Sequence, residues 1–454
     1  MPSSVRALIA PAYLFVCLLL GGSAQGIWQN MILELLGLAI IGWCAWDKRG
    51  DQFSSETRQL FFLAAAFVVL VALQAIPLPS AIWAHLGPRE NIAAGFRTLG
   101  LPAPAEPLSL TPAASLDSLF MIIPSLAIFC AMVGLKAYRR RWLAVALILA
   151  TVAGIALGAL QVGSSAPDAS SWYLYEDTNV GKAVGFFANA DHMATLLLVT
   201  IPFVAAIVAA GRRTGVQRYS AIVAIAAAIA MVLLAGIALN GSLAGYGLAL
   251  PVIAASALII VPRKGQLRTW IISIAAVLLI VSVAALETTP IGTGKIGEHA
   301  KSAVQSRSEI LSTTARAAGQ FMPFGSGLGS FRRVYPLYES PGQVTPVYVV
   351  HAHNDLIEFV LELGLAGLVL VLLFLAWWGS AVWKVWRSGE LRPFARAASI
   401  ASGAILVHSL VDFPLRTAAI GACFGMCLAL LADRRGVPAE KEQAELRSSR
   451  HVVI

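Results

Sequence analysis

Twelve apolar segments, spread along almost the whole chain, constrain the fold more than any other feature of this sequence. A helix of about 20 apolar residues crosses the hydrocarbon core of a bilayer, whereas strands of a membrane barrel are about ten residues long and alternate in polarity. The segments lie at 7–22, 29–46, 60–76, 116–135, 142–162, 192–210, 219–239, 243–261, 269–286, 355–378, 395–411 and 415–432. We therefore expect an all-α, polytopic integral membrane helical bundle with about 12 transmembrane helices.

The composition agrees with a membrane protein. Of the 454 residues, 58% are hydrophobic and only 13% are charged, whereas about a quarter of a soluble chain is charged. All five cysteines fall inside apolar segments, so the sequence predicts neither a disulfide framework nor a cysteine-based metal site. The first segment follows Arg6 and ends in Gly-Ser-Ala-Gln, which also fits a cleavable signal peptide.

Basic residues predict how the bundle is oriented. Twenty-three of the 33 Lys and Arg residues lie at the N-terminus, around the loops that follow the even-numbered segments and in the C-terminal tail. Because short cytoplasmic loops are enriched in Lys and Arg, we expect both termini to be cytoplasmic. The net charge of +9 is then explained by membrane orientation, and nucleic acid is not an expected partner.

Long connections on the opposite face divide the chain. We expect spans 1–9 with two shorter external loops over residues 1–286, a large external loop over 287–353, spans 10–12 over 354–432 and a basic cytoplasmic tail over 433–454. The cytoplasmic connections are too short for a nucleotide-binding domain and the sequence has no Gly-x-x-x-x-Gly-Lys motif, which excludes an ATP-driven pump. Any chemistry therefore belongs on the external side.

The large loop is rich in basic residues, which suits an anionic substrate, although a solvated loop is the alternative. Residues 300–322 have the periodicity of an amphipathic helix. Its predicted apolar stripe consists of Val304, Ile310, Leu311, Ala315, Ala318 and Met322. Arg307 falls within that stripe, where an unpaired charge is costly. We expect Arg307 either to bind an anion or to form a structural ion pair.

Two motifs close the loop. Residues 325–331 read Gly-Ser-Gly-Leu-Gly-Ser-Phe, which fits either a plain turn or an amide nest for phosphate. His351-Ala352-His353-Asn354 then leads into span ten, where the imidazoles suit a general base or an anion contact and Asn354 suits a helix N-cap. A zinc site is the rival interpretation of the histidines. Glu362 lies inside the span, and an intramembrane carboxylate is a functional candidate.

A polar cluster is predicted between spans eleven and twelve. In His408-Ser409-Leu410-Val411-Asp412-Phe413-Pro414-Leu415-Arg416, His408 and Asp412 are one helical turn apart and Arg416 follows across the turn. Two interpretations are open, a mutually satisfied structural cluster and a role for Arg416 in lining a site.

Together these motifs resemble a known family. They are the glycine-rich turn with its Phe, the His-Asn pair leading into a span with Glu and Gly-Leu-x-Gly, the 408–416 segment, and Gly-Phe-Phe-Ala-Asn-Ala-Asp-His-Met-Ala at 185–194. Over about residues 108–432 the chain resembles the O-antigen ligase and polymerase superfamily of bacterial envelope glycosyltransferases.

The resemblance implies an inner-membrane enzyme that takes glycan from an undecaprenyl diphosphate carrier at the periplasmic face and needs no metal or other cofactor. Its acceptor would be another lipid-linked glycan or the lipid A core. By position, Arg307 would contact the diphosphate and His353 would be the catalytic base. Further substrate contacts would be His351, Asn354, Arg332, Arg416 and His192. The family often has Ser-Arg-Gly before span eight, whereas this chain reads Gly-Ser-Leu-Ala-Gly at 241–245, so Lys182 or another loop cation would substitute.

A membrane carrier or flippase for polysaccharide precursors is the competing class. Such transporters usually show repeated halves with broken spans at matching positions, and this sequence shows neither, which favours an enzyme. The sequence does not decide between polymerase and ligase. The Asp-Phe-Pro-Leu-Arg segment tilts the interpretation towards a polymer-forming enzyme by resemblance alone.

Overall fold

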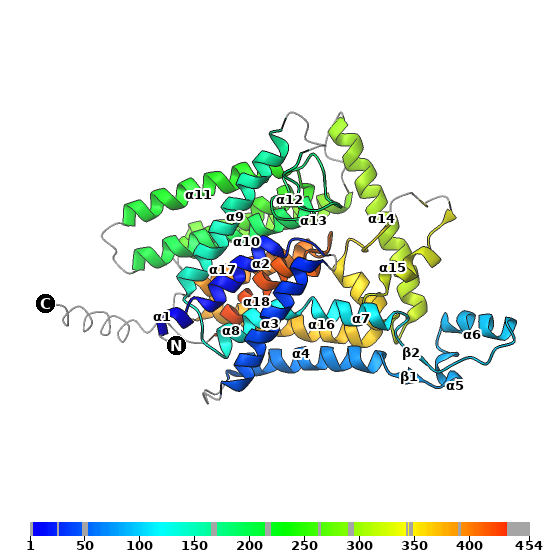
Figure 1. Ribbon diagram of the computed structural model, residues 1–454. Helices are drawn as coiled ribbons and strands as arrows, with labels where there is room; N and C mark the ends of the chain where they lie inside the picture. The colour runs from blue at the N-terminus through cyan, green and yellow to red at the C-terminus, as the bar shows by residue number, and fades with distance from the viewer. Residues whose placement is uncertain are drawn as a thin grey trace.

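A computed structural model describes residues 3–24, 27–47, 53–164, 170–213, 219–261, 265–288, 295–341, 344, 348–388 and 392–433. Long helices run side by side in one bundle, with shorter elements gathered beyond one of its ends (Figure 1). The expected all-α membrane fold is confirmed. The two-residue strands β1 and β2 pair antiparallel outside the bundle, with Pro77 opposite Pro107.

The bounds of the elements, in chain order, are α1 (Ser3–Arg6), α2 (Ile9–Leu20), α3 (Trp28–Trp46), α4 (Ser55–Gln74), β1 (Pro77–Leu78), α5 (Ser80–Trp83), α6 (Arg89–Thr98), β2 (Glu106–Pro107), α7 (Pro112–Phe120), α8 (Ile123–Val133), α9 (Arg140–Val162), α10 (Ala190–Arg213), α11 (Tyr219–Asn240), α12 (Leu243–Ile260), α13 (Gln266–Thr288), α14 (Lys295–Phe321), α15 (Phe331–Val334), the 3-10 helix η2 (Tyr335–Leu337), α16 (Asp355–Arg387), α17 (Pro393–His408), the 3-10 helix η4 (Pro414–Arg416) and α18 (Ala418–Ala432).

In the described part of the chain, eight helices are long and apolar enough to cross a membrane, judged by length and composition. These are Trp28–Trp46, Ser55–Gln74, Pro112–Val133, Arg140–Val162, Ala190–Arg212, Tyr219–Asn240, Leu243–Ile260 and Asp355–Arg387. Three shorter apolar helices accompany them, at Ser4–Leu20, Gln266–Ser282 and Ala418–Ala432. Each of the twelve predicted apolar segments holds helix, and about twelve crossings remains our expectation.

The core of the bundle contains many alanines among larger apolar side chains. α10 packs against α9, α11, α12 and α17, while α18 packs against α2, α8 and α17. Small side chains allow such helices to approach closely. At Gly425 a Cβ atom would lie 2.3 Å from the carbonyl oxygen of Ser125, so this crossing of α18 and α8 requires glycine.

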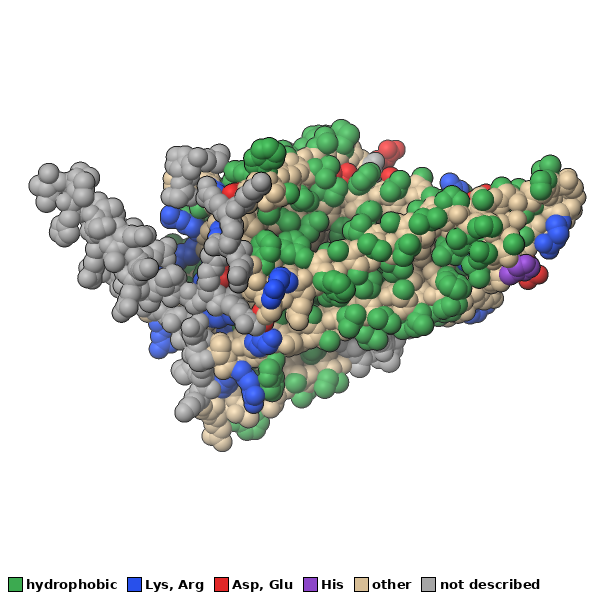
Figure 2. Space-filling view, turned by 90° about the horizontal axis from the view of Figure 1, so that it is seen from below, with side chains coloured by type: hydrophobic (Ala, Val, Ile, Leu, Met, Phe, Trp, Pro, Cys, Tyr) green, Lys and Arg blue, Asp and Glu red, His purple; other side chains and the backbone are tan. Residues whose placement is uncertain are grey.

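The two ends of the bundle differ in character. At one end, which we call the basic end, Arg6 pairs with Asp47 at 2.5 Å and Arg140 pairs with Asp433 at 2.8 Å. Lys and Arg side chains gather there, whereas apolar side chains cover the middle of the molecule (Figure 2). The opposite end, with α14 and α15, we call the loop end (Figure 1). The predicted cytoplasmic and external segments thus lie at opposite ends. Residues 434–454 of the predicted tail lie outside the described residues.

The predicted helix of the large loop is confirmed as α14, but its predicted apolar stripe is correct only for Ile310 and Ala318. The buried face consists of Ile310, Thr313, Thr314, Ala317, Ala318 and Phe321. Leu311, Ala315 and Met322 are exposed instead, and the side chain of Val304 lies outside the described residues. Two threonines are tolerated on the packed face because Thr314 donates its hydroxyl to the carbonyl of Ile310 at 2.7 Å.

The glycine-rich turn fills a break in α16. Gly364 has a non-helical backbone with φ 62°, which frees backbone groups of the helix. The carbonyls of Leu361 and Glu362 accept from the amides of Ser326 and Gly327 at 2.9 and 2.8 Å. Buried backbone groups need such partners. Because these amides are occupied, the plain-turn interpretation fits the structure better than an amide nest for phosphate.

Arg89 attaches the first external loop to this turn. Its side chain is 1% exposed and donates to the carbonyls of Leu108 and Gly325, the second at 2.8 Å. Burial lowers the pKa of Arg89 to about 10. The segments predicted as the first and third external loops are therefore joined at the loop end.

Candidate functional site

A cavity of about 1170 Å³ opens at the loop end, between α3, α7, α10, α15, α16 and η4. We call it the polar cavity. Five of the predicted site residues line it: His192, Arg332, His351, His353 and Arg416. They come from four separate parts of the chain, so the fold brings together residues that the sequence only suggested one by one.

Asp412 is the shared partner of two histidines. Its buried carboxylate lies 2.9 Å from His353 Nδ1 and 3.4 Å from His192 Nε2. Burial raises the pKa of Asp412, but the hydrogen bond to His353 and the nearby charges of His192 and Arg307 outweigh it and hold the pKa well below its usual range.

The ionised Asp412 carboxylate determines which nitrogen of His353 carries the proton. A carboxylate only accepts hydrogen bonds, so His353 Nδ1 must donate to Asp412. In the neutral ring this leaves Nε2 with a free lone pair. The side chain of His353 is 28% exposed and lines the polar cavity. The imidazole that carries this lone pair is therefore accessible from the cavity.

The backbone at His353 is unusual, because its φ of 50° lies in the left-handed region. For a residue other than glycine this conformation costs about 1–2 kcal/mol. It is held by the contact of His353 with Asp412 and by Asn354, whose side chain accepts from the amides of Leu356 and Ile357 at 3.0 and 3.1 Å. Strained positions of this kind cluster at functional sites.

Arg416 is surrounded by carboxylates of the first turns of α16. It lies 3.5 Å from Asp355, 3.2 Å from Glu358 and 3.3 Å from Glu362. Burial lowers the pKa of Arg416, but the attraction of these acids outweighs it and raises the pKa above its usual range. Glu358 also contacts His351 Nδ1 at 2.9 Å, so His351 has an acidic partner as His353 does.

Phe413 organises the imidazoles. Its ring centre lies 4.3 Å from that of His351, 5.0 Å from His192 and 5.1 Å from His353. The ring is 7% exposed, and in sequence it lies between Asp412 and Arg416. A large apolar ring at this position limits how far the three imidazoles can move.

Arg307 pairs with Asp191 at 2.8 Å. Burial lowers the pKa of Arg307, but the charges of Asp191 and Asp412 outweigh it and raise it. Asp191 also accepts from the hydroxyl of Ser242. The described contacts therefore give Arg307 the ion pair that was the alternative to anion binding, and Arg307 is not among the residues lining the polar cavity.

Two further predicted site residues lie outside the cavity wall. Asn354 caps α16 and donates its side-chain amide to the carbonyl of Leu410 at 2.8 Å. Lys182 is exposed on the loop before α10, where its carbonyl accepts from the hydroxyl of Tyr173.

The predicted mutual cluster of His408, Asp412 and Arg416 does not form. His408 contacts the Thr195 hydroxyl through Nδ1 at 2.8 Å, and Arg416 points to the acids of α16. The reason is that α17 ends at His408, so Asp412 lies in the following turn and Arg416 in η4 rather than on the face of the helix that carries His408. The alternative, in which Arg416 lines a site, agrees with the structure.

Two carboxylates from α3 and α7 also line the polar cavity. Glu34 of α3 and Asp117 of α7 line it and are near enough to influence one another electrostatically. Trp28 and Tyr348 add exposed aromatic rings, 62% and 83% exposed. The lining of the cavity therefore combines imidazoles and arginines with carboxylates and aromatic rings.

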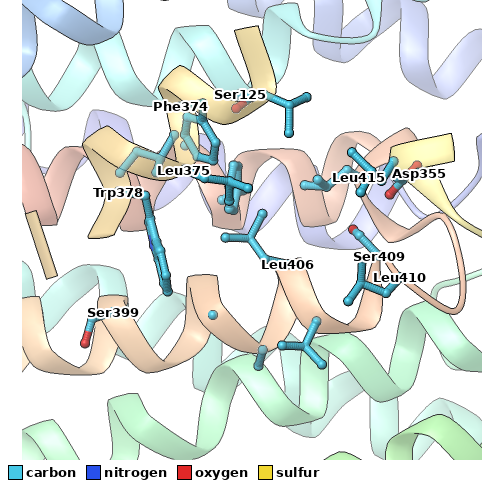
Figure 3. Close-up of a pocket in the computed structure, with 18 of the residues that line it drawn as sticks. Ser125, Asp355, Phe374, Leu375, Trp378, Ser399, Leu406, Ser409, Leu410 and Leu415 are labelled. Atoms are coloured by element: carbon cyan, nitrogen blue, oxygen red, sulfur yellow. The ribbon is translucent and has the colours of Figure 1, made fainter. Parts of the chain in front are cut away.

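An apolar groove of about 880 Å³ runs along α4, α8, α16 and α17. Trp378 and Ser399 lie towards one end and Asp355, Ser409 and Leu410 towards the other (Figure 3). Because Asp355 lies 3.5 Å from Arg416, the groove ends beside the polar cavity.

Reasoning from the sequence found the histidines and arginines but missed two of their carboxylate partners. Asp191 and Glu358 were not singled out, although each is an acid in the first turn of a membrane helix, which was the available signal. In the described part of the chain no group of three or more His, Cys, Asp or Glu residues is arranged to hold a metal ion.

The fold and the site define a multi-pass membrane protein with a polar cavity at one end of its helical bundle. Residues 228–372 match the family model described as O-Antigen ligase, in agreement with the resemblance drawn from the motifs of the chain. The match includes Arg307, Arg332, His351 and His353. It supports membrane glycan ligase or polymerase activity in general. A search of curated proteins found no match.

Proposed function

We propose that this chain is an inner-membrane glycosyltransferase that moves glycan from an undecaprenyl diphosphate carrier to an acceptor hydroxyl, with its loop end in the periplasm and both termini in the cytoplasm. The observation that carries the proposal is the His353–Asp412 pair in the wall of the polar cavity, 2.9 Å apart. It supplies a positioned base of the kind that such a transfer needs.

In the proposed reaction the acceptor oxygen attacks the anomeric carbon of the donor sugar. The bond from that carbon to the diphosphate oxygen breaks, and its electron pair leaves with the diphosphate. The hydroxyl proton passes to Nε2 of His353, while Asp412 stabilises the resulting imidazolium. Direct displacement inverts the anomeric centre. The donor carries its own leaving group, so we propose no nucleotide, metal or other cofactor.

The apolar groove supports a lipid-linked donor. Besides α4, α8, α16 and α17, residues of α12, α13 and α18 line it, and it ends beside Arg416. We propose that the polyprenyl chain lies in this groove, since apolar surface favours it. The diphosphate then reaches the wall with His351 and Arg332, and His192, Asn354 and Lys182 stay proposed contacts.

The carboxylates of Glu34 and Asp117 in the polar cavity support a binding site for sugar residues. Carboxylates accept hydrogen bonds from hydroxyl groups, and aromatic rings such as Trp28 offer flat apolar surface. We propose that glycan lies against Glu34 and Asp117, away from the diphosphate that they would repel.

The test is transfer by the purified full-length protein with a lipid-linked glycan donor. His353→Ala should slow product formation by about 10² to 10⁴ while donor still binds, because only the proton acceptor is removed. His351→Ala should be milder if His351 contacts the anion. Near-normal turnover in His353→Ala would contradict the base role. Activity lost with a chelator and restored by zinc would replace it with a metal site.

Polymerase and ligase differ in acceptor, and glycan analysis of a deletion strain separates them. We favour a polymerase, for which single repeat units should remain on the carrier. Intact polymer stranded on the carrier would identify a ligase that transfers to the lipid A core.

A further inference from the structure

The exposed apolar stripe of α4 continues beyond the end of the helix. Phe62, Val69 and Leu73 are exposed on α4, and their spacing of seven and four residues places them on one helical face. Ile76 is exposed three residues later, and it donates its amide to the carbonyl of Leu73 at 3.3 Å, so the chain still turns there. Such a stripe on a helix long and apolar enough to cross a membrane faces lipid. The lipid-facing surface of α4 therefore leads directly into the segment that follows.

That segment is residues 76–107, which we call the hairpin lobe. It consists of β1, α5, α6 and β2 and lies beyond the end of α4 (Figure 1). The lobe has its own small core, in which the buried Trp83 donates its indole N–H to the carbonyl of Pro104 at 2.8 Å. Ile82 and Leu99 do not belong to that core and are 50% and 73% exposed. These two side chains are therefore available for a contact outside the lobe.

Apolar side chains cover the lobe on the same face of the molecule as α4. Seen from that side, they continue from the bundle along the lobe, and basic, acidic and histidine side chains appear at its far end (Figure 2). The exposed ionisable residues of the lobe include His85, Glu90 and Arg97. Segments at the membrane–water interface have this pattern, because their apolar side chains contact acyl chains while their ionisable side chains reach headgroups and water.

The lobe is attached firmly to the bundle. Arg89 of α6 donates to the carbonyl of Gly325 at 2.8 Å. At the other end of the lobe, the amide of Ser109 donates to the carbonyl of Gln74 at 2.8 Å. The lobe thus begins and ends at the last turn of α4, which fixes its position relative to the exposed stripe of that helix.

We propose that the hairpin lobe is an interfacial anchor. It lies in the headgroup layer of the leaflet at the loop end and inserts Ile76 and Ile82 among the upper parts of the acyl chains. Because Arg89 bonds to Gly325, the anchor also ties the turn that fills the break in α16 to the membrane surface. The anchor requires the membrane fold but not the proposed glycan transfer, so either can fail without the other.

The experiment measures how deeply a nitroxide spin label lies when the full-length protein is in liposomes of phosphatidylethanolamine and phosphatidylglycerol. The label is attached at Ile82→Cys in a Cys44→Ser background, because the other four native cysteines are buried. Oxygen, which concentrates among acyl chains, should relax this label at least about twofold more than a water-soluble nickel chelate does. Glu90→Cys is the matched control on the same lobe, where the chelate should be the stronger relaxant.

Two results would overturn the anchor. Stronger relaxation by the nickel chelate at Ile82→Cys would mean that the lobe projects into water. A label that neither reagent reaches would mean that a protein, such as a second copy of this chain, covers the apolar surface instead of lipid. Ile76→Cys repeats the measurement at the end of α4, and size-exclusion elution of each labelled protein shows whether it is folded, so the test does not depend on one variant.

Discussion

At the scale of single residues, the chemistry of the site depends on which nitrogen of each imidazole faces the cavity. His353 presents Nε2 because Asp412 holds Nδ1 at 2.9 Å. The same logic applies to His351, whose Nδ1 faces Glu358 at 2.9 Å. Two histidines two positions apart therefore have similar surroundings, and the left-handed backbone of His353 is the feature that distinguishes it.

We predict that Asp412→Asn lowers kcat by about 10² to 10⁴ with little change in donor binding, because an amide can donate to Nδ1 and stabilise the wrong tautomer. Steady-state kinetics with lipid-linked donor would measure it. Glu358→Gln serves as the comparison, since it makes the same change at His351. An equal loss of kcat in both variants would contradict a base role specific to His353.

At the scale of elements, the break in α16 and the turn that fills it act as one unit. Gly325 has φ 77°, and a Cβ there would lie 2.4 Å from the carbonyl oxygen of Glu362 and 2.6 Å from the amide of Gly364. Leu365 donates its amide to the carbonyl of Pro323 at 2.9 Å. This contact fixes the start of α16, and with it Glu358 and Glu362.

We predict that Gly325→Ala destabilises the protein by about 2 kcal/mol or more, because the left-handed backbone and the close carbonyl both oppose a side chain. Gly319→Ala in α14 is the control, since a Cβ there meets nothing within 4 Å and alanine favours helix. Thermal unfolding in detergent would show a lower midpoint for the first variant and an equal or higher midpoint for the second. Equal midpoints would contradict the packing role of the turn.

At the scale of the whole molecule, the two ends of the bundle hold different structural features. The basic end holds Arg6 and Arg140 in ion pairs with Asp47 and Asp433. The loop end holds the polar cavity, α14 and α15. The excess of Lys and Arg at one end predicts that it faces the cytoplasm.

We predict that a cysteine at Ser340 reacts with a membrane-impermeant maleimide in intact spheroplasts, and that one at Ser388, at the other end of α16, reacts only after permeabilisation. Positive charge retained in the cytoplasm is the physical reason. The wild-type protein gives the background from its own five cysteines, four of which are buried. The reverse labelling pattern would invert the topology and place the cavity on the wrong side for a periplasmic reaction.

The sequence by itself predicted the helical membrane fold, the twelve apolar segments and the candidate histidines. It could do so because segment length, hydropathy and charge are local properties, and they govern how a chain inserts into a bilayer. It misplaced the packed face of α14, since Thr313 and Thr314 are buried only because their neighbours and backbone satisfy them. The tertiary structure alone decided that Asp412 meets His353, 59 positions away, and that Arg416 meets Glu362, 54 positions away. Residues so distant in sequence meet because helices pack against each other, and a local sequence pattern does not contain that information.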